Sequence, residues 1–391
     1  MVTGRAGPGR PARRGLLGVV TAVVLVGCVG NSEGAIDPAP THLPTQTGPG
    51  GKVERHTAPD PEKQSVTALP PVEVTGSGRA TVLFTGDLML ARSIGDIILA
   101  EGPQAPWEGI ADELAAADLR VGVLETAVGS AGVAEDKAYT FQAPPEAADN
   151  LSAGGFDVVT LANNHSYDFG AEGLLETERL VVAAGVRAVG AGDSLGSARS
   201  GVILAAEGVE LGFLGYVAVP DDWSGYRNQG WAAGAQTPGV AWAEPELITE
   251  DVTRLRQAVD HVVVLLHAGD EGSTSVNPVQ VAAAEAACGA GASAVVGSHP
   301  HVLQGWALED GRLVAWFLGN TVFDGFDAIP ESLESALLTV TFTPETIEEA
   351  SFVPVLVDDR GLPQTLDPEG AEGRTVLDRL EALPTPSLPR R

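Results

Sequence analysis

The sequence predicts an α/β domain with buried, largely parallel strands. Short apolar runs rich in Val, Leu and Ala alternate with longer segments of helical periodicity along most of the chain. Five of these apolar runs are followed within a few residues by acidic, amide or imidazole residues. Toward the end of the region, apolar runs follow one another without helices between them, which predicts an added antiparallel portion.

The first half of the predicted domain alternates strands with helices. Apolar and β-branched runs predict strands at 80–85, 119–124, 157–161, near 188, at 202–205 and at 211–217. Helical periodicity predicts helices at 94–100, 110–116, 145–153 and 172–184. The stretch 221–242 has no clean period, and connections of that length are commonly lids or binding loops.

The second half continues the alternation and then loses its helices. Helices at 245–259 and 278–289 lead into strands at 261–266 and 294–296. Further strands are expected at 313–318, 336–342 and 352–357. The remainder is rich in proline and has one helical pattern near 376–383.

The charge balance excludes one class of partner. The chain has 23 basic and 52 acidic residues, a formal net charge of −29. Four arginines lie in the first fifteen positions, so a chain without that segment has a net charge of −33. Such a field repels phosphate backbones and anionic surfaces. We therefore expect no nucleic-acid partner, and a polyanion is expected to bind only at a metal or a local basic patch.

The N-terminus has the pattern of an export signal. An Arg-rich opening is followed by an apolar run over 15–26 and then by Gly27-Cys28, which matches a bacterial lipoprotein signal with an acylated cysteine. An ordinary signal peptide, or an uncleaved anchor with an incidental cysteine, is the alternative. On the first interpretation, the protein is exported and anchored by lipid on the outer face of the cytoplasmic membrane.

These patterns divide the chain into four parts. Residues 1–27 are interpreted as the signal peptide, and 28–78 as the lipidated Cys28 with a disordered tether rich in Pro, Gly, Thr and Ser. The folded domain is expected at 79–357, followed by a Pro-rich tail at 358–391.

The residues at the strand ends predict a metal site. They are carboxylates, amides and imidazoles: Asp87, Glu125, Asn164 with His165, His267, and His299 with His301. Ligands of open α/β sheets bind beyond the carboxyl ends of the strands, so these side chains are expected to meet in one crevice. This mixture of donors suits one or two ions of Mn²⁺, Fe²⁺ or Zn²⁺ better than the all-oxygen shell of Ca²⁺.

Each residue alone also has a structural interpretation. Asp87 and Asn164 are residue types that form turns or caps, and Glu125 can cap a neighbouring helix. His267 follows five apolar residues and can be a hydrogen-bonded core histidine. His299-Pro300-His301 is more specific, because alternate residues at a strand end can both face one site.

Six segments together resemble, in the same order, the motif series of the poly-γ-glutamate capsule-synthesis (CapA) family. They are Thr85–Arg92, Leu124–Thr126, Leu161–Asp168, His267–Glu271, Gly297–His301 and Leu318–Asp324. The resemblance covers roughly residues 80–357. It implies a metallophosphatase-like (calcineurin-like) fold, an α/β/β/α sandwich with mixed sheets.

The resemblance also implies residue roles. The metal ligands would be Asp87, Glu125, Asn164, His267, His299 and His301. His165 resembles a proton donor, and Arg92 either clamps an anionic group or is a solvated surface residue. Glu271 is expected to orient the ring of His267. Asn320 either lines the site or forms a turn.

The sequence departs from the expected pattern at two positions. Met89 stands where metallophosphatases have a histidine, and Val123 stands where the capsule family often has an asparagine. One metal position would keep four ligands: Glu125, Asn164, His267 and His299. The other would keep three: Asp87, Glu125 and His301.

Three functions follow as hypotheses. The first is a cell-surface lipoprotein acting in biosynthesis or export of poly-γ-glutamate or a related capsular exopolymer, together with a polymer-synthase membrane complex. The second is a metal-dependent hydrolase of a phosphoester or amide of the cell envelope, with an anionic polymer or phosphoester as substrate. The third is a non-catalytic, metal-stabilised scaffold of a membrane complex.

Overall fold

The computed structural model describes residues 76–221, 224–326 and 330–387. The predicted signal peptide, Cys28 and most of the predicted tether therefore lie outside the described residues. Within the described part of the chain, no helix is both long enough and apolar enough to cross a membrane.

The larger of two mixed sheets has the strand order β18-β17-β16-β1-β2-β5-β6, with β15 also paired to β1. Its strands are β1 (Ala80–Leu88), β2 (Leu119–Leu124), β5 (Val158–Thr160), β6 (Arg187–Val189), β15 (Asn320–Val322), β16 (Glu334–Phe342), β17 (Ile347–Val357) and β18 (Pro363–Thr365). Strand β1 runs parallel to β2 and β15 and antiparallel to β16. The predicted antiparallel portion is formed by β16, β17 and β18.

The second sheet has the order β13-β14-β12-β11-β9-β8. Its strands are β8 (Val202–Ala206), β9 (Val209–Ala218), β11 (His261–Ala268), β12 (Ala294–Ser298), β13 (Gln304–Glu309) and β14 (Arg312–Phe317). Strands β9, β11, β12 and β14 are parallel, and the edge strands β8 and β13 are antiparallel. Two short pairs lie apart from both sheets: β3 (Ala127–Val128) with β4 (Gln142–Ala143), and β7 (Ala191–Gly192) with β10 (Gly239–Val240).

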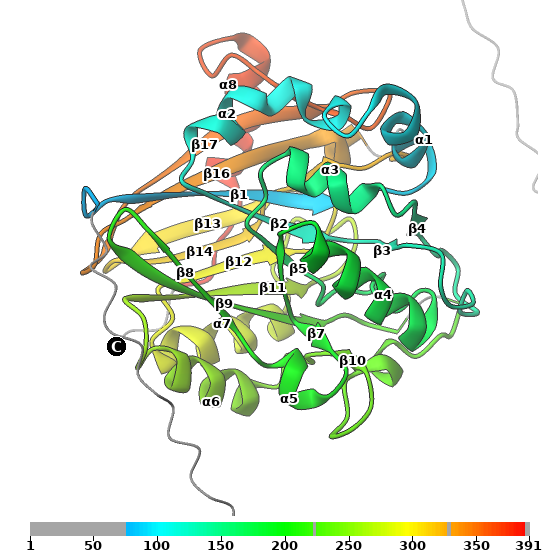
Figure 1. The fold of residues 1–391 in the computed structure, drawn as a ribbon. Helices are drawn as coiled ribbons and strands as arrows, with labels where there is room; N and C mark the ends of the chain where they lie inside the picture. The colour runs from blue at the N-terminus through cyan, green and yellow to red at the C-terminus, as the bar shows by residue number, and fades with distance from the viewer. Residues whose placement is uncertain (1–75, 222–223, 327–329, 388–391) are drawn as a thin grey trace, which may run out of the picture. The chain divides into compact units, whose positions relative to one another are not determined.

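Helices cover the outer faces of both sheets (Figure 1). The larger sheet is covered by α1 (Arg92–Glu101), α2 (Ala111–Ala116), α3 (Ala147–Ala153) and α4 (Gly170–Ala183). The smaller sheet is covered by α6 (Pro245–Leu255) and α7 (Pro278–Ala290), with the short α5 (Leu195–Ala198) nearby. Short 3-10 segments span Ala105–Ile110, Asn228–Trp231 and Pro330–Leu333.

Alternating side chains explain this layering. Along β11, Val262 and Val264 pack with α6 and α7, whereas Val263 and Leu265 face the larger sheet. Along β1, Phe84 joins the apolar layer between the sheets, and Leu83 packs under the helices of the other face. The predicted α/β/β/α sandwich with mixed sheets is therefore confirmed.

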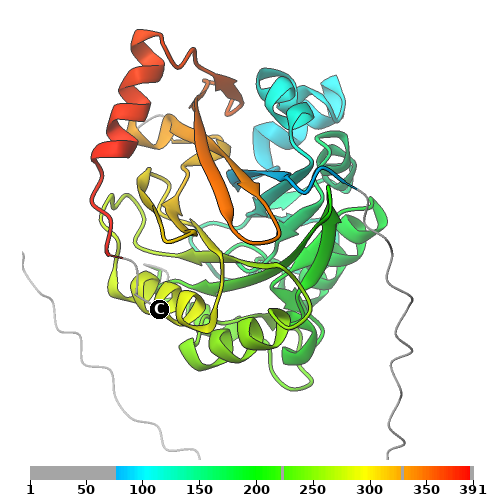
Figure 2. The same ribbon diagram turned by 90° about the vertical axis from the view of Figure 1, so that its left-hand side faces the viewer.

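The C-terminal segment contains more regular structure than the sequence predicts. Beyond residue 357, β18 pairs with β17, and α8 (Ala371–Ala382) packs with Val376 and Leu380 against Leu303 and Ala336 (Figure 2). The sequence predicts a helix near 376–383 but not its docking. A three-residue strand containing proline carries no periodic signal, and only its pairing with β17 holds it in the sheet.

Candidate metal centre

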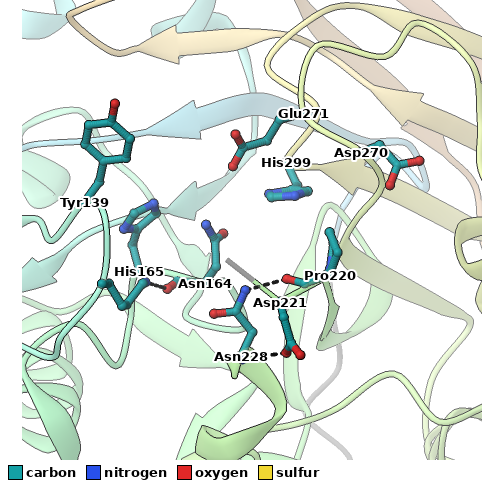
Figure 3. Close-up of a pocket in the computed structure, with 10 residues that line it drawn as sticks. Tyr139, Asn164, His165, Pro220, Asp221, Asn228, Asp270, Glu271 and His299 are labelled. Atoms are coloured by element: carbon teal, nitrogen blue, oxygen red, sulfur yellow. Dashed lines mark hydrogen bonds between the residues drawn. The ribbon is translucent and has the colours of Figure 1, made fainter. Parts of the chain in front are cut away.

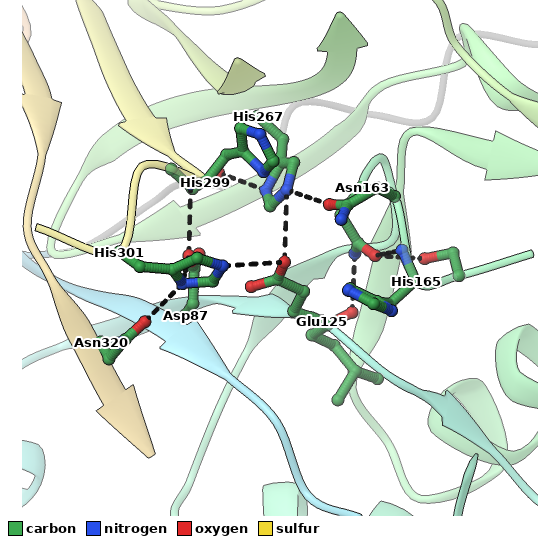
Figure 4. A network of polar contacts seen from close by, with 12 residues as sticks. Asp87, Glu125, Asn163, His165, His267, His299, His301 and Asn320 are labelled. Carbon is green, nitrogen blue, oxygen red and sulfur yellow. Dashed lines mark hydrogen bonds and ion pairs between the residues drawn. The ribbon is translucent and has the colours of Figure 1, made fainter. Parts of the chain in front are cut away.

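The strand ends predicted to converge do so at one edge of the sandwich. Asp87 lies near the end of β1 and Glu125 directly after β2, while Asn164 and His165 follow β5. The second sheet contributes the imidazoles: His267 lies near the end of β11, and His299 and His301 follow β12. Figure 4 shows the two carboxylates and the imidazoles of His267, His299 and His301 facing one another around a common centre. The structure thus brings all six predicted metal ligands together, with His165 beside them.

One glycine lets the two segments approach closely here. A Cβ on Gly86 would lie 1.7 Å from the Gly319 carbonyl oxygen, closer than atoms can approach. The Gly319 carbonyl accepts a hydrogen bond from the Asp87 N–H at 3.3 Å, and Asp87 pairs in register with Asn320. Gly86 therefore allows the segment carrying Asn320 to lie directly beside Asp87.

Three overlapping groups of side chains place their donor atoms within 4.8 Å of one another. They are Glu125 with His267 and His299, Asp87 with Glu125 and His301, and Glu271 with His299 and His301. Within them, Glu125 Oε1 lies 3.5 Å from His267 Nε2 and 3.9 Å from His301 Nε2. The Asn164 Oδ1 atom lies 2.7 Å from His267 Nε2, so the amide faces the same point.

Several buried polar atoms of this cluster have no hydrogen-bond partner within the described residues: Asp87 Oδ1, both Glu125 carboxylate oxygens, and both ring nitrogens of His299. Asp87, Glu125 and His267 are fully buried, and His299 nearly so. Buried polar groups without partners cost stability, and native proteins rarely retain them without a ligand or a function. A divalent cation would satisfy the carboxylate oxygens and one ring nitrogen of His299, so the residues present fit a metal ion.

Neighbouring side chains fix the ring orientations. Asn320 Oδ1 lies 2.8 Å from His301 Nδ1, and its amide nitrogen donates to the Ser332 carbonyl at 3.1 Å. An amide oxygen only accepts, so His301 Nδ1 carries the proton and Nε2 is left as a donor for a metal. Asn164 Oδ1 accepts from His267 Nε2 at 2.7 Å, so the Ser298 hydroxyl donates to Nδ1 at 2.8 Å and holds the orientation of that ring.

The backbone around these histidines is strained. His299 has φ 103° and His301 has φ 57°, in the region that side chains other than glycine rarely adopt. The turned backbone points the His299 N–H at Asp87 Oδ2, 3.2 Å away. Such conformations cost about 1–3 kcal/mol each and occur mostly where a site requires them.

Burial changes the pKa values of the ionisable groups in the cluster. Burial first, and the neighbouring charge of Glu125 second, hold the pKa of Asp87 well above its usual value. Burial likewise raises the pKa of Glu125. Burial lowers the pKa values of His267 and His299 well below normal and that of His301 to about 3. The imidazoles are therefore neutral at neutral pH and available as ligands, and a bound cation would keep the carboxylates ionised.

His165 lies on a different hydrogen-bonding system. Its Nδ1 is 2.7 Å from Asp168 Oδ2, and Asp168 is also paired with the buried Lys137 at 2.5 Å. Phe141 stacks on the ring with 4.1 Å between centroids. Burial lowers the pKa of His165, and the nearby Asp168 opposes that shift. Because a carboxylate only accepts, Nδ1 carries the proton, and Nε2 can exchange a proton with a molecule in the cavity.

Two cavities open onto the cluster. One, of about 230 Å³, is lined by Lys137, Asn164, His165, Asp221, Glu271 and His299 among others (Figure 3). The other, of about 280 Å³, is lined by Arg92, Phe141, His165, Glu271, His301 and Phe326 among others. The predicted lid or binding loop 221–242 contributes Asp221 and Asn228 to the first cavity. Its Trp231 is buried against Trp242 and anchors the loop.

Three predicted residues have contacts that the sequence does not specify. Arg92 lines the second cavity but is already paired with Asp324 and lies over the Phe141 ring at 4.8 Å. Glu271 lies beside His299 and His301, whereas Nδ1 of His267 contacts Ser298 instead. Asn320 both pairs with β1 and contacts His301.

Sequence reasoning missed Ser298, Lys137 and Asp168 as contributors. Asp168 stands three residues after His165, a spacing that places both on one turn and was available as a signal. Ser298 directly precedes a predicted ligand. Lys137 lies in an irregular segment without any motif, so nothing in the sequence marks it.

Known proteins and a protein family are similar to the part of this chain that carries the site. The model of a family described as "Bacterial capsule synthesis protein PGA_cap" matches residues 81–325. A "PGA biosynthesis protein CapA" of Bacillus subtilis is 31% identical over 302 residues, covering 74% of this chain and 77% of that protein. A "Capsule biosynthesis protein CapA" of Bacillus anthracis is 29% identical over 273 residues, covering 67% of this chain and 64% of that protein.

More distant similarities extend this set. A "Probable polyglutamine synthesis accessory protein" of Mycobacterium tuberculosis is 28% identical over 305 residues, covering 67% of this chain and 80% of that protein. The crystal structure of a hypothetical protein from Thermus thermophilus superimposes with a TM-score of 0.45 at 19% identity, over 70% of this chain and 98% of that one. A similarity of that size does not bear on the site.

Proposed function

Because this chain belongs to the bacterial capsule synthesis protein family, we propose that it acts in the biosynthesis or export of poly-γ-glutamate or a related capsular exopolymer, through a divalent-metal site. The names of the relatives from Bacillus subtilis and Mycobacterium tuberculosis support a polyglutamate or polyglutamine context. The observation that carries the metal site is the set of buried carboxylate and imidazole atoms that have no hydrogen-bond partner among the described residues. The carboxylates and imidazoles suit Mn²⁺, Fe²⁺ or Zn²⁺.

The first metal position would be formed by Glu125, Asn164, His267 and His299. An ion held by these residues would supply Lewis-acid chemistry toward a phosphoryl or acyl substrate. Ser298 orients the His267 ring, and Glu125 faces His267 across 3.5 Å.

Beside that position, His165 would move a proton. Its Nδ1–H is held by Asp168, and Lys137 holds Asp168 in turn. The free Nε2 belongs to a ring that lines both cavities, where a leaving group or a water molecule would lie. This arrangement favours a second candidate function: a metal-dependent hydrolase of a phosphoester or amide in the cell envelope.

Arg92 would contact an anionic group of the substrate. Its guanidinium lines the same cavity as His301 and is held in place by Asp324 and Phe141. The pairing with Asp324 neutralises much of its charge, so Arg92 would contribute directional hydrogen bonds more than a net positive field. This suits an overall acidic protein that must handle a polyanion at one point only.

The location of the protein is part of the proposal. The Arg-rich opening, the apolar run 15–26 and Cys28 support export and lipid anchoring on the outer face of the cytoplasmic membrane. An anchored metal protein there would act beside a membrane-bound polymer synthase.

The test measures bound metal and turnover on the full chain. Wild type is compared with His267→Ala, His165→Ala and His261→Ala after loading with Mn²⁺ or Zn²⁺, using a panel of phosphoester and γ-glutamyl substrates. His261 is the matched control, because it lies on the same strand as His267 but contacts Ser293 and the Thr343 carbonyl at the far end. Metal is expected to be lost in His267→Ala and kept in His165→Ala and His261→Ala.

The outcomes separate the functions. Turnover that disappears in His165→Ala while metal is retained establishes the hydrolase. Metal that binds through His267 without turnover on any substrate favours an assembly role, including that of a non-catalytic scaffold. A wild-type protein that binds no metal, or a His267→Ala variant that binds as well as wild type, overturns the metal site.

A further inference from the structure

The second group of buried ligands does not complete a coordination shell. Asp87, Glu125 and His301 place donor atoms within 4.8 Å of one another, and His301 Nε2 is directed to this point because Asn320 holds Nδ1. First-row divalent ions take at least four ligands in proteins. A water molecule or a side chain from another element would complete the shell.

Strand β1 does not supply that donor. Met89, two residues after Asp87, is fully buried in the apolar layer under the helices. Its sulfur accepts the Ala91 N–H at 3.2 Å, so it is engaged within its own turn. The soft thioether is also a poor ligand for Mn²⁺, which prefers oxygen donors.

Glu271 approaches His301, the member that this group shares with another, from the solvent side. It lies on the loop after β11 and is the exposed member of the group that it forms with His299 and His301. It lines both cavities, and Figure 3 shows it beside His299. The loop is fixed to the histidine segment, because the Gly272 N–H donates to the Pro300 carbonyl at 2.8 Å. The carboxylate is therefore held near both imidazoles by the backbone.

We propose that Glu271 is a ligand of a second metal position completed with Asp87, Glu125 and His301, and that this position exchanges its ion more readily than the first. The inference rests on the metal site of the proposed function. Three carboxylates and one imidazole form an oxygen-rich set, which favours Mn²⁺, whereas the two imidazoles of the first position suit Zn²⁺ or Fe²⁺ as well. A ligand on an exposed loop is displaced more easily than the buried side chains that form the first position.

The experiment is a Mn²⁺ titration of the metal-free full chain, followed by electron paramagnetic resonance and by metal analysis after desalting. Two ions that share the Glu125 carboxylate are magnetically coupled, so the spectrum of isolated Mn²⁺ is suppressed when both positions fill. Wild type is compared with Glu271→Gln and with Asp270→Asn, which makes the same charge change on the neighbouring residue of the loop. His267→Ala reports on the first position.

Wild type is expected to bind a tight and a weaker Mn²⁺. Glu271→Gln should weaken only the second ion, by about tenfold or more, and restore the isolated-ion spectrum. Asp270→Asn should leave both affinities within about twofold. Single-ion binding in wild type that depends on His267, or a Glu271→Gln variant indistinguishable from Asp270→Asn, overturns the Glu271 assignment alone. A wild-type protein that binds no Mn²⁺ overturns the metal site and this inference with it.

Discussion

Two buried charged clusters in this protein are built in opposite ways. Near α6, the Asp251 carboxylate is almost fully buried, and both of its oxygens are paired. Arg199 Nε and the Tyr216 hydroxyl each donate to Oδ2 at 2.8 Å, and Arg254 reaches Oδ1 at 2.8 Å. At the strand ends, Asp87 and Glu125 are equally buried, but three of their four carboxylate oxygens have no hydrogen-bond partner among the described residues.

The difference shows what each cluster is for. A buried carboxylate with every lone pair satisfied holds neighbouring elements together and has no capacity for another ligand. A buried carboxylate without partners lowers the stability of the metal-free protein. Binding of a cation restores that stability. Burial alone therefore does not identify a functional site, whereas several buried atoms without partners that converge on one point indicate one.

The largest change in stability is expected at the Asp251 cluster, whose carboxylate oxygens are both paired. Asp251→Ala should lower the free energy of unfolding by about 3–5 kcal/mol, because it leaves the Arg199 guanidinium and the Tyr216 hydroxyl without their acceptor. Urea denaturation measures the change, and metal stoichiometry should not move. Glu250→Ala is the control, since that partner of Arg199 is 67% exposed and its pair is worth about 1 kcal/mol at most. Equal effects from the two variants would contradict the comparison.

A smaller effect, on metal affinity, is expected at Asn320, which orients the ring of His301. Asn320→Ala should weaken Mn²⁺ binding by about 10–100-fold, because His301 Nδ1 loses the acceptor that directs Nε2 into the site. Asn320→Asp keeps an acceptor at the same place and should retain most of the affinity. Calorimetric titration of the metal-free protein provides the measurement. If both variants bind like wild type, Asn320 has only a structural role.

The smallest expected effect is a gain in stability where the first prediction is a loss. In the metal-free protein, Asp87→Asn should raise the free energy of unfolding by about 1 kcal/mol at neutral pH, because it removes a buried charge beside Glu125. The raised pKa of Asp87 means that the folded state binds the proton more tightly than the unfolded state. Wild-type stability therefore falls as pH rises through the folded-state pKa, and the advantage of the variant shrinks as pH falls toward about 4.

Thermal unfolding from about pH 4 to about pH 8, with and without Mn²⁺, measures how the stability of wild type and Asp87→Asn depends on pH and on metal. Added metal should stabilise wild type more than Asp87→Asn, reversing their order. A variant that is less stable than wild type at every pH without metal would show that Asp87 is a satisfied structural residue after all.

The sequence alone determined the layered fold and the location of the site. The strands at 80–88, 119–124 and 261–268 were predictable because their apolar and β-branched runs are long and end in abrupt polar residues. The convergence of Asp87, Glu125, Asn164, His267, His299 and His301 followed from a general property of parallel strands. Family membership followed from six short motifs in a fixed order, because each motif encodes a strand end and the residue that it presents.

Only the tertiary structure decided which buried polar atoms have hydrogen-bond partners. Ser298 and Asn320 orient two imidazole rings, and Met89 is directed into the core. Glu271 is brought to His299 and His301 through the contact between Gly272 and Pro300. The docking of α8 and the short strand β18 were likewise fixed only by their partners. The physical reason is the same in each case. Periodicity reports which face of an element is buried, but hydrogen bonds between segments far apart in sequence depend on distances that exist only after the two sheets have packed.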